Sequence, residues 1–226
     1  MSKFARKIQK NTEKLLIDNF VEIFKHSTTR QEKLNKRFSF VLAGGKSPIN
    51  LYKKLSKLNV NWKNIDFFWG DERFISRNSK FSNFKLIDKY LFRDIKVKQN
   101  QIFAIDTNKK SALFAAKNYE KKIKSYFKKK FFSFDLILLG MGMDGHIASL
   151  YPKDKDILSK KIVRNVHGED FDRITIGLNL INKAKKICLW LPTVKKKKYY
   201  YKISNIKKKP VNLLKKNKMT IFSILR

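Results

Sequence analysis

The sequence is poor in the residue types that build disulfides and metal sites. Its 226 residues include one cysteine and three histidines. Cys188 has no partner for an internal disulfide, and its apolar surroundings indicate a buried, unreactive thiol. With so few potential ligands there is no zinc-type spacing, and we expect neither a metal nor a cofactor.

Long apolar segments and linkers are also missing. No segment approaches the roughly 18 consecutive apolar residues of a membrane-spanning helix. The first residues, MSKFARKIQKNTEK, are too polar for the core of a secretory signal. The chain has four prolines and eight glycines, and no Pro/Gly-rich linker or repeat divides it. We therefore expect a single cytoplasmic domain, residues 1–226, which is monomeric and makes no membrane contact.

Acidic residues are scarce: 18 Asp and Glu stand against 53 Lys and Arg, which gives a formal charge of +35. Such an excess suits a nucleic-acid-binding protein, and lysine runs at residues 128–130, 195–198 and 207–209 support that alternative. The lysines are spread along the whole chain, however, together with abundant Asn, Ile and Phe. All four residue types have AT-rich codons. We therefore favour biased coding DNA as the cause, and expect only non-specific nucleic-acid binding at low salt.

The sequence does contain a regular alternation of apolar strands and amphipathic helices. Expected strands lie at residues 38–42, 65–69, 102–105, 136–139, 173–176, 187–191 and 219–225. Expected helices lie at residues 3–26, 48–58, 79–92, 111–127 and 178–184, with another beginning at 195. Residues 157–167 read as irregular, and residues 148–150 as the opening of a helix that Pro152 limits. This order predicts an α/β fold with a mainly parallel sheet.

Three strand ends carry residues that can do chemistry. After the first expected strand, Gly44 and Gly45 allow close backbone approach to a ligand, and Ser47 before Pro48 predicts an N-cap and a helix start. Free N–H groups at a helix start bind phosphate. The longer spacing and Gly-Lys-Ser/Thr ending of a Walker loop are absent, so this turn alone is a weak signal.

The second strand ends in a charged triplet, Asp71, Glu72 and Arg73. Unpaired charge at the end of a buried strand is costly, so each group needs a partner. Arg73 either pairs with Asp71 or Glu72, or directs its guanidinium at a substrate oxyanion. The sequence leaves these two alternatives open.

The third and most informative stretch is FDLILLGMGMDGHIASLYP, residues 134–152. A buried apolar strand runs into a turn with Gly140, Gly142 and Gly145, and this turn carries Asp144 and His146. Parallel strands bring their carboxyl ends to one edge of the sheet. The three turns therefore predict an anion site beside an acid/base group.

Four segments occur in an order that resembles the 6-phosphogluconolactonase branch of the glucosamine-6-phosphate isomerase/6-phosphogluconolactonase family. They are AGGKSP, FFWGDERF with Ser82-Asn83 after it, FDLILLGMGMDGHIASLYP and DRITIGLNLINKAKKI. The resemblance covers roughly residues 5–225, and the third segment is the most specific. It implies a three-layer Rossmann-like sandwich like that of glucosamine-6-phosphate deaminase and ribose-5-phosphate isomerase. The implied activity is hydrolysis of 6-phospho-D-glucono-1,5-lactone to 6-phospho-D-gluconate, in the oxidative pentose phosphate pathway.

The resemblance also implies roles for individual residues. His146 matches the family's base, whose ordinary pKa near 6.5 suits proton abstraction from water, and Asp144 would orient it. Backbone amides from Gly140 to Gly145 would stabilise the carbonyl oxyanion. The phosphate would be held by Gly44, Gly45, Ser47, Arg73 and Lys196.

This chain departs from the family pattern in three places. Lys46 replaces a common Ser, Thr or Arg, and residues 74–76 replace a common xVP. Thr193 stands where the family has glycine, three residues before its lysine, and the run at 195–198 leaves the register uncertain by one residue.

The nearest alternative is a deaminase or isomerase of the same fold. Its loop resembles DGHIAFNEPG, in which a glutamate follows the histidine, and it tends to carry Asp-Glu-Tyr in place of Asp-Glu-Arg. Here residues 148–152 read ASLYP, without a carboxylate. Ring opening and proton shuttling between carbons need that extra carboxylate, so the sequence favours hydrolysis.

Overall fold

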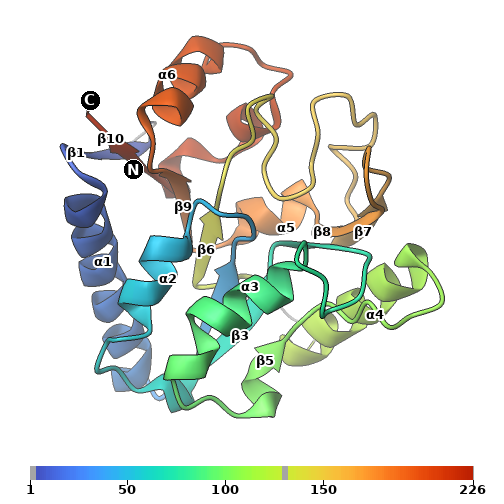
Figure 1. Ribbon diagram of the computed structural model, residues 1–226, viewed down its shortest axis with the longest axis horizontal. Coiled ribbons are helices and arrows are strands. Elements are labelled where there is room, and N and C mark those ends of the chain that lie inside the picture. Colours follow the sequence, from blue (N-terminus) through green and yellow to red (C-terminus); the bar gives the residue numbers. More distant parts are fainter. Residues whose placement is uncertain (1–3, 129–131, 226) are drawn as a thin grey trace.

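A parallel sheet forms the centre of the computed structural model, which describes residues 4–128 and 132–225 (Figure 1). Its strand order is β1-β10-β9-β6-β2-β3-β5, and every neighbouring pair is parallel. The strands are β1 (Arg6–Lys10), β2 (Phe38–Leu42), β3 (Ile65–Trp69), β5 (Ile102–Phe103), β6 (Leu136–Leu139), β9 (Lys186–Leu191) and β10 (Met219–Ile224). A smaller antiparallel sheet, ordered β4-β8-β7, consists of β4 (Asp71–Arg73), β8 (Arg173–Ile176) and β7 (Val163–Val166). The expected α/β fold with a mainly parallel sheet is confirmed.

Helices cover both faces of the parallel sheet. They are α1 (Glu13–Lys33), α2 (Ile49–Leu55), α3 (Asn83–Tyr90), α4 (Ala112–Tyr126), α5 (Leu178–Lys183) and α6 (Val194–Ile203). In Figure 1, α1 runs beside β1 and β10, whereas α4 lies at the other side of the molecule, below β7 and β8. Within the described ranges, no helix combines the length and the apolar character needed to cross a bilayer.

The two faces of β3 show why the sheet is covered on both sides. Phe67 and Phe68 are consecutive, so their side chains point to opposite faces. Phe67 packs with Phe40, in the layer that contains the α1 residue Phe24. Phe68 instead contacts Tyr126 of α4, at a ring-centroid distance of 4.9 Å. Strands with two buried faces need mostly apolar sequences. β6 is apolar throughout and β9 is apolar after its first residue, whereas β2 and β3 each include one buried polar residue, Ser39 and Asp66.

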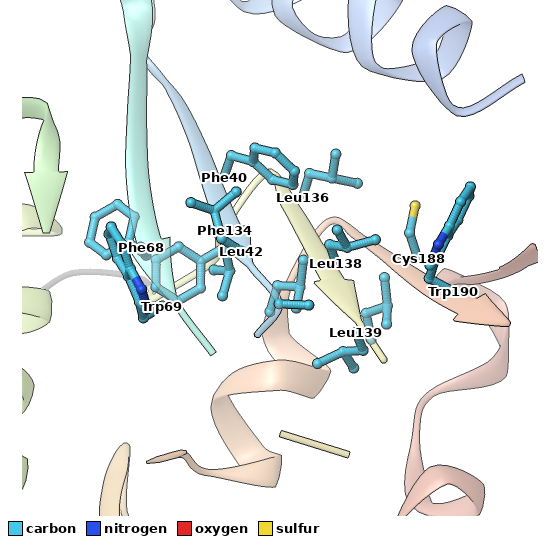
Figure 2. Packing of buried hydrophobic residues seen from close by; sticks show 14 of the residues in the cluster. Phe40, Leu42, Phe68, Trp69, Phe134, Leu136, Leu138, Leu139, Cys188 and Trp190 are labelled. Carbon is cyan, nitrogen blue, oxygen red and sulfur yellow. The ribbon is translucent and has the colours of Figure 1, made fainter. Parts of the chain in front are cut away.

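Strand β6 lies in the middle of this core. Figure 2 shows its leucines between the aromatic residues of β2 and β3 on one side and β9 on the other. Phe134, just before the strand, packs on Phe68 at a centroid distance of 4.8 Å. Cys188 of β9 is buried here, and burial raises the pKa of its thiol to about 12. The expectation of a buried cysteine is therefore confirmed, and the raised pKa agrees with an unreactive thiol.

The strand order reverses between β2 and β6, and this reversal positions the site. From β2 the chain continues outward to β3 and β5, whereas from β6 it continues in the opposite direction to β9 and β10. The first connections after β2 and β6 thus diverge, which opens a crevice at the carboxyl ends of these two neighbouring strands. Ligands of open α/β sheets bind at such a switch point.

The N-terminal segment differs from its prediction. Residues 3–26 were expected to be helical, but residues 6–10 form β1, and α1 begins only after the N-cap residue Thr12. The sequence of β1 is polar, with Ile8 as its one buried side chain, and pairing with β10 decides its conformation. Helix α1 then continues to Lys33, because Ser27, Thr28 and Gln31 extend its buried face beyond the expected end.

Two short strands were also not predicted. Residues 71–73 form β4, and β7 lies inside the segment 157–167 that was expected to be irregular. Both strands take part in the smaller sheet by pairing with β8. Strands of three or four residues carry too little periodicity to be recognised without their partners. That residues 1–226 form one domain, and that the chain is monomeric, stay predictions.

Replacing the buried Leu138 by alanine is expected to lower the free energy of unfolding by about 2–5 kcal/mol, because the central strand cannot close the cavity. Urea unfolding followed by circular dichroism measures this change. Leu15→Ala is the matched control, since Leu15 on α1 is 46% exposed, and its effect should stay within about 0.5 kcal/mol. Equal losses in both variants would contradict the placement of β6 in the core.

Candidate functional site

A cleft of about 210 Å³ opens at the carboxyl ends of β2 and β6. Three turns and one helix supply most of its walls, together with Asn83 of α3 and Arg173 of β8. The turns follow β2, β3 and β6, and the helix is α6. Of the predicted site residues, the cleft brings together Gly44, Gly45, Ser47, Arg73, Gly140, Gly142, His146 and Lys196. Asp144 lies beside it, in an adjoining hollow that also includes His146.

The turn after β2 is held from both sides. The buried Tyr52 hydroxyl donates to the carbonyl of Ala43 at 2.6 Å, and Trp190 Nε1 donates to the carbonyl of Ser47 at 3.1 Å. The predicted N-cap role of Ser47 is wrong. Helix α2 starts at Ile49, Pro48 occupies the cap position, and no side chain caps the helix. Ser47 Oγ instead accepts a hydrogen bond from Lys196 Nζ at 2.7 Å, which fixes the lysine over this turn.

The structure resolves the register of the lysine run. Lys196 points toward the cleft, whereas Lys195 and Lys198 are exposed, and Lys197 Nζ donates to the carbonyl of Leu225. Burial lowers the pKa of Lys196, which sits on the first turn of α6. Thr193, the departure from the family glycine, is the N-cap of this helix, and its Oγ1 accepts from the Lys196 amide at 3.3 Å. The substitution therefore provides a start for the helix that carries the lysine.

Arg73 is held by neighbours other than those considered from the sequence. Its Nη1 donates to the carbonyl of Phe81 and to Asn83 Oδ1, each at 2.8 Å. Within the described residues it forms no ion pair with Asp71 or Glu72. Asn83 Nδ2 also donates to the carbonyl of Asp71, at 2.9 Å. One buried amide side chain thus couples the guanidinium to the backbone of β4.

The same amide explains the first glycine of the turn after β2. A Cβ placed on Gly44 would lie 2.1 Å from the Asn83 side chain, so no larger residue fits there. The close approach joins the Gly44 turn to the Arg73 guanidinium through a single side chain. Asn83 is a positioning residue for this end of the cleft.

Glu72 is almost fully buried and joins β4 to the start of α3. Its carboxylate accepts hydrogen bonds from the backbone N–H groups of Arg73 at 2.9 Å, Asn83 at 2.9 Å and Phe84 at 2.7 Å. Burial raises the pKa of Glu72 to about 7, and the N–H groups oppose that rise because they favour the charged form. This carboxyl group therefore fixes the backbone at Arg73 relative to the start of α3 at Asn83.

His146 and Asp144 form a directed pair. The distance from His146 Nδ1 to Asp144 Oδ1 is 2.7 Å, and the same oxygen accepts the His146 backbone N–H at 3.0 Å. A carboxylate only accepts, so the proton lies on Nδ1 and the lone pair of Nε2 is free to act as a base. The Tyr151 ring packs against the imidazole at a centroid distance of 4.9 Å.

Gly142 is required by this imidazole. A Cβ at Gly142 would lie 2.2 Å from His146 Cε1. The Gly142 N–H donates to the His146 carbonyl at 2.9 Å, and the Gly145 N–H donates to the Gly142 carbonyl at 3.1 Å. These two amides are therefore used inside the turn, which differs from the expected oxyanion role. Gly145, with φ of +92°, faces Ile203 and Lys209 and does not line the cleft.

The residues after His146 form a tight turn, where a helix opening was expected. Ala148 adopts a left-handed conformation with φ of 47°, and Ile147 forms a bridge with Leu150. This turn directs the buried Ser149 Oγ to Asp71 Oδ2, at 2.6 Å. This hydrogen bond ties the turn to β4. The chain therefore turns back at these residues and does not continue as a helix.

Sequence reasoning missed several cleft residues, and Arg173 is the most consequential. It opens β8 directly opposite Arg73 of β4, so two guanidinium groups flank the cleft. The alternation of RITI pointed to a strand, but only its pairing with β4 brings the arginine to the site. With Lys46 and Lys196, the cleft wall carries four positive side chains and one carboxylate, Asp71, among its described residues. Such a surface suits an anionic ligand.

No cluster of three or more His, Cys, Asp and Glu side chains suited to a metal ion occurs in residues 4–128 and 132–225. His167 lines the adjoining hollow and pairs with Asp172, and His26 is exposed on α1.

The family model and the similar proteins found by comparison point to the same family. Residues 11–222 match the family model described as glucosamine-6-phosphate isomerases/6-phosphogluconolactonase. The chain is 34% identical over 161 residues to 6-phosphogluconolactonase of Haemophilus influenzae, covering 69% of this chain and 68% of that protein. It is 30% identical over 198 residues to the Helicobacter pylori enzyme of the same name, covering 83% and 80%. The match to the Thermotoga maritima 6-phosphogluconolactonase is 36% over 141 residues and spans 62% of that protein's length.

Solved structures share the fold over nearly the whole chain. A crystal structure of 6-phosphogluconolactonase from Thermotoga maritima superposes with a TM-score of 0.84 and 24% identity, covering 99% of both chains. A monomeric glucosamine-6-phosphate deaminase superposes with a TM-score of 0.82 and 21% identity, covering 97% of both chains. The fold is thus common to both activities and does not distinguish them.

Replacing Glu72 by glutamine is expected to change how stability depends on pH. Between its ordinary value of 4.5 and about 7, the folded chain holds a proton on Glu72 that the unfolded chain has released. The stabilisation from this group is complete below pH 4.5 and is lost as the pH rises through about 7. Unfolding free energies of the wild type minus those of Glu72→Gln, measured by urea titration, should therefore fall by roughly 1–3 kcal/mol from pH 4.5 to 7.5. A difference that is independent of pH would show that Glu72 is ionised throughout.

Proposed function

Because the chain belongs to the glucosamine-6-phosphate isomerase/6-phosphogluconolactonase family, we propose that it hydrolyses 6-phospho-D-glucono-1,5-lactone to 6-phospho-D-gluconate, in the oxidative pentose phosphate pathway. The observation that carries the proposal is the His146–Asp144 pair at the edge of a positively charged cleft. The cleft combines a base with an anion site, and the proposed substrate combines a lactone with a phosphate.

The phosphate binds at the end of the cleft formed by the turn after β2. Lys196 Nζ and Ser47 Oγ are already 2.7 Å apart there, and Gly44 and Gly45 expose their backbone beside them. Arg73 adds a second positive charge from the opposite wall, where Asn83 fixes it. An ammonium and a guanidinium on one phosphate give charge-assisted hydrogen bonds.

The lactone ring then lies toward His146. Nε2 of this histidine takes a proton from water as the water oxygen attacks C1, and the C1 carbonyl electrons move to its oxygen. When this oxyanion collapses, the bond between C1 and the ring oxygen breaks, and the ring oxygen takes the proton from the imidazolium. The carboxylic acid formed loses its own proton to solvent. Asp144 keeps Nδ1 protonated and stabilises the imidazolium in between.

The composition of the cleft supports hydrolysis over a deaminase or isomerase reaction. Those reactions move protons between carbons and need a further carboxylate. Among its described lining residues the cleft contains one carboxylate, Asp71, which already accepts from Ser149. In the deaminase-type segment DGHIAFNEPG the glutamate comes five residues after the histidine, and this chain has Tyr151 at that position.

Purified protein is expected to accelerate lactone hydrolysis above the spontaneous rate, measured as acid release in a weakly buffered pH assay. His146→Ala should lower kcat by about 10²–10⁴-fold, the usual contribution of a positioned base. His26→Ala is the matched control. His26 is exposed on α1, and no residue of this helix lines the cleft. Normal kcat in His146→Ala would remove the proposed base. Ammonia release from glucosamine 6-phosphate without lactone hydrolysis would favour the deaminase.

Lys196→Met is expected to weaken substrate binding more than it slows the chemical step. Loss of a charge-assisted contact of about 1.5–3 kcal/mol should raise KM about 10–100-fold, with a smaller change in kcat. Lys198→Met, on the exposed side of the same helix, is the charge-matched control and should leave both constants unchanged. Equal effects of the two variants would indicate that only the overall positive field matters.

A further inference from the structure

Arg173 lies at the junction of two hollows. One is the cleft described above, and the other is a neighbouring hollow of about 900 Å³ between the segment after His146 and the β7–β8 connection. Two residues line both spaces, His146 and Arg173. Arg173 and the proposed base therefore border the same two spaces.

The lack of a partner distinguishes Arg173 from two other arginines of this chain, the buried Arg164 and the exposed Arg37. Arg164 binds Asp154 through both terminal nitrogens, at 2.6 and 2.8 Å. Arg37 binds Asp66 in the same two-pronged manner. Arg173 has no ion-pair partner among the described residues, and its buried Nε donates to no acceptor there. An unpaired guanidinium is costly to bury, which indicates that an anionic group from outside the chain completes its surroundings.

Arg173 also differs from its neighbour across the strand pair. Arg73 uses Nη1 for Phe81 and Asn83, and Asn83 joins it to the Gly44 turn at the phosphate end. Arg173 also lines the adjoining hollow, which His146 borders and Arg73 does not. Burial raises the pKa of the Tyr151 hydroxyl and the charge of Arg173 opposes this rise, while the Tyr151 ring packs on His146. Arg173, Tyr151 and His146 all line the adjoining hollow.

Attack on a lactone carbonyl places negative charge on the carbonyl oxygen, and that charge needs a donor. Of the glycine amides in the turn that carries the base, those of Gly142 and Gly145 donate within that turn. Building on the proposed lactonase function, we propose that Arg173 binds the C1 carbonyl oxygen, stabilises it as an oxyanion and then holds the carboxylate of the product. Arg73 and Lys196 remain with the phosphate. Water reaches His146 from the adjoining hollow.

Two ligands separate a role at C1 from a role at the phosphate. 6-Phosphogluconate carries both a carboxylate and a phosphate, whereas sorbitol 6-phosphate has the same phosphate with an uncharged C1 alcohol. Arg173→Gln should weaken calorimetric binding of 6-phosphogluconate about 10–100-fold and leave sorbitol 6-phosphate binding unchanged. It should also lower kcat for the lactone by about 10²–10³-fold, the usual cost of losing an oxyanion donor.

Arg77→Gln is the charge-matched control. Arg77 lies over the Phe84 ring, 4.6 Å from its centroid, and is not among the residues that line the cleft. It should bind both ligands as the wild type does. Arg173→Lys keeps the charge without the planar fork, and should recover part of the lost kcat. If Arg173→Gln fails to fold, as judged by thermal melting, Arg173→Lys alone should still show a selective loss of 6-phosphogluconate affinity.

Weaker binding of both ligands would assign Arg173 to the phosphate and overturn the inference. An unchanged kcat in Arg173→Gln, with an active wild type, would also overturn it and leave the proposed function intact. A wild type that does not accelerate lactone hydrolysis would instead contradict the proposed function itself.

Discussion

The parallel pairing of β2 with β6 is the constraint on which the site depends. These two strands are neighbours in space although nearly a hundred residues separate them in sequence, and their pairing aligns Phe40 with Leu136. Both strands therefore end at the same edge of the sheet, and their glycine turns face each other across the crevice. The cleft exists because the connections leave these strand ends in opposite directions.

The smaller antiparallel sheet adds side chains to the cleft that opens at the switch point. Pairing of β4 with β8 places Arg73 opposite Arg173, and Ser149 joins Asp71 to the turn that carries His146. Positive side chains that would repel one another are held at fixed positions by neutral groups, with Asn83 on one arginine and Ser47 on Lys196. An anionic ligand in the cleft would relieve their mutual repulsion. This arrangement is one of preorganised charge, and folding supplies it before the substrate arrives.

The fold and the main site were largely predictable because they rest on local signals. Continuous apolar runs such as LILL and FFW predict strands covered on both faces, and the segment around His146 is specific enough to indicate a family. The predictions of secondary structure were wrong where tertiary contacts override local preference. Residues 6–10 are a strand because β10 needs a partner, and residues 148–150 turn back because Ser149 binds Asp71. Ser47 looked like a helix cap and is instead a hydrogen-bond partner of Lys196.

The sequence alone determined the α/β class, the inert Cys188 and the residues that meet at the cleft from the turns after β2, β3 and β6. Those features depend on composition, periodicity and short motifs, which neighbouring residues encode together. Only the tertiary structure decided that Lys196 is the lysine of its run that faces the cleft, that Asn83 couples Arg73 to Gly44, and that Arg173 lines the same cleft as His146. These depend on side chains from separate elements, and their distances follow from strand register and packing, which no local stretch of sequence specifies.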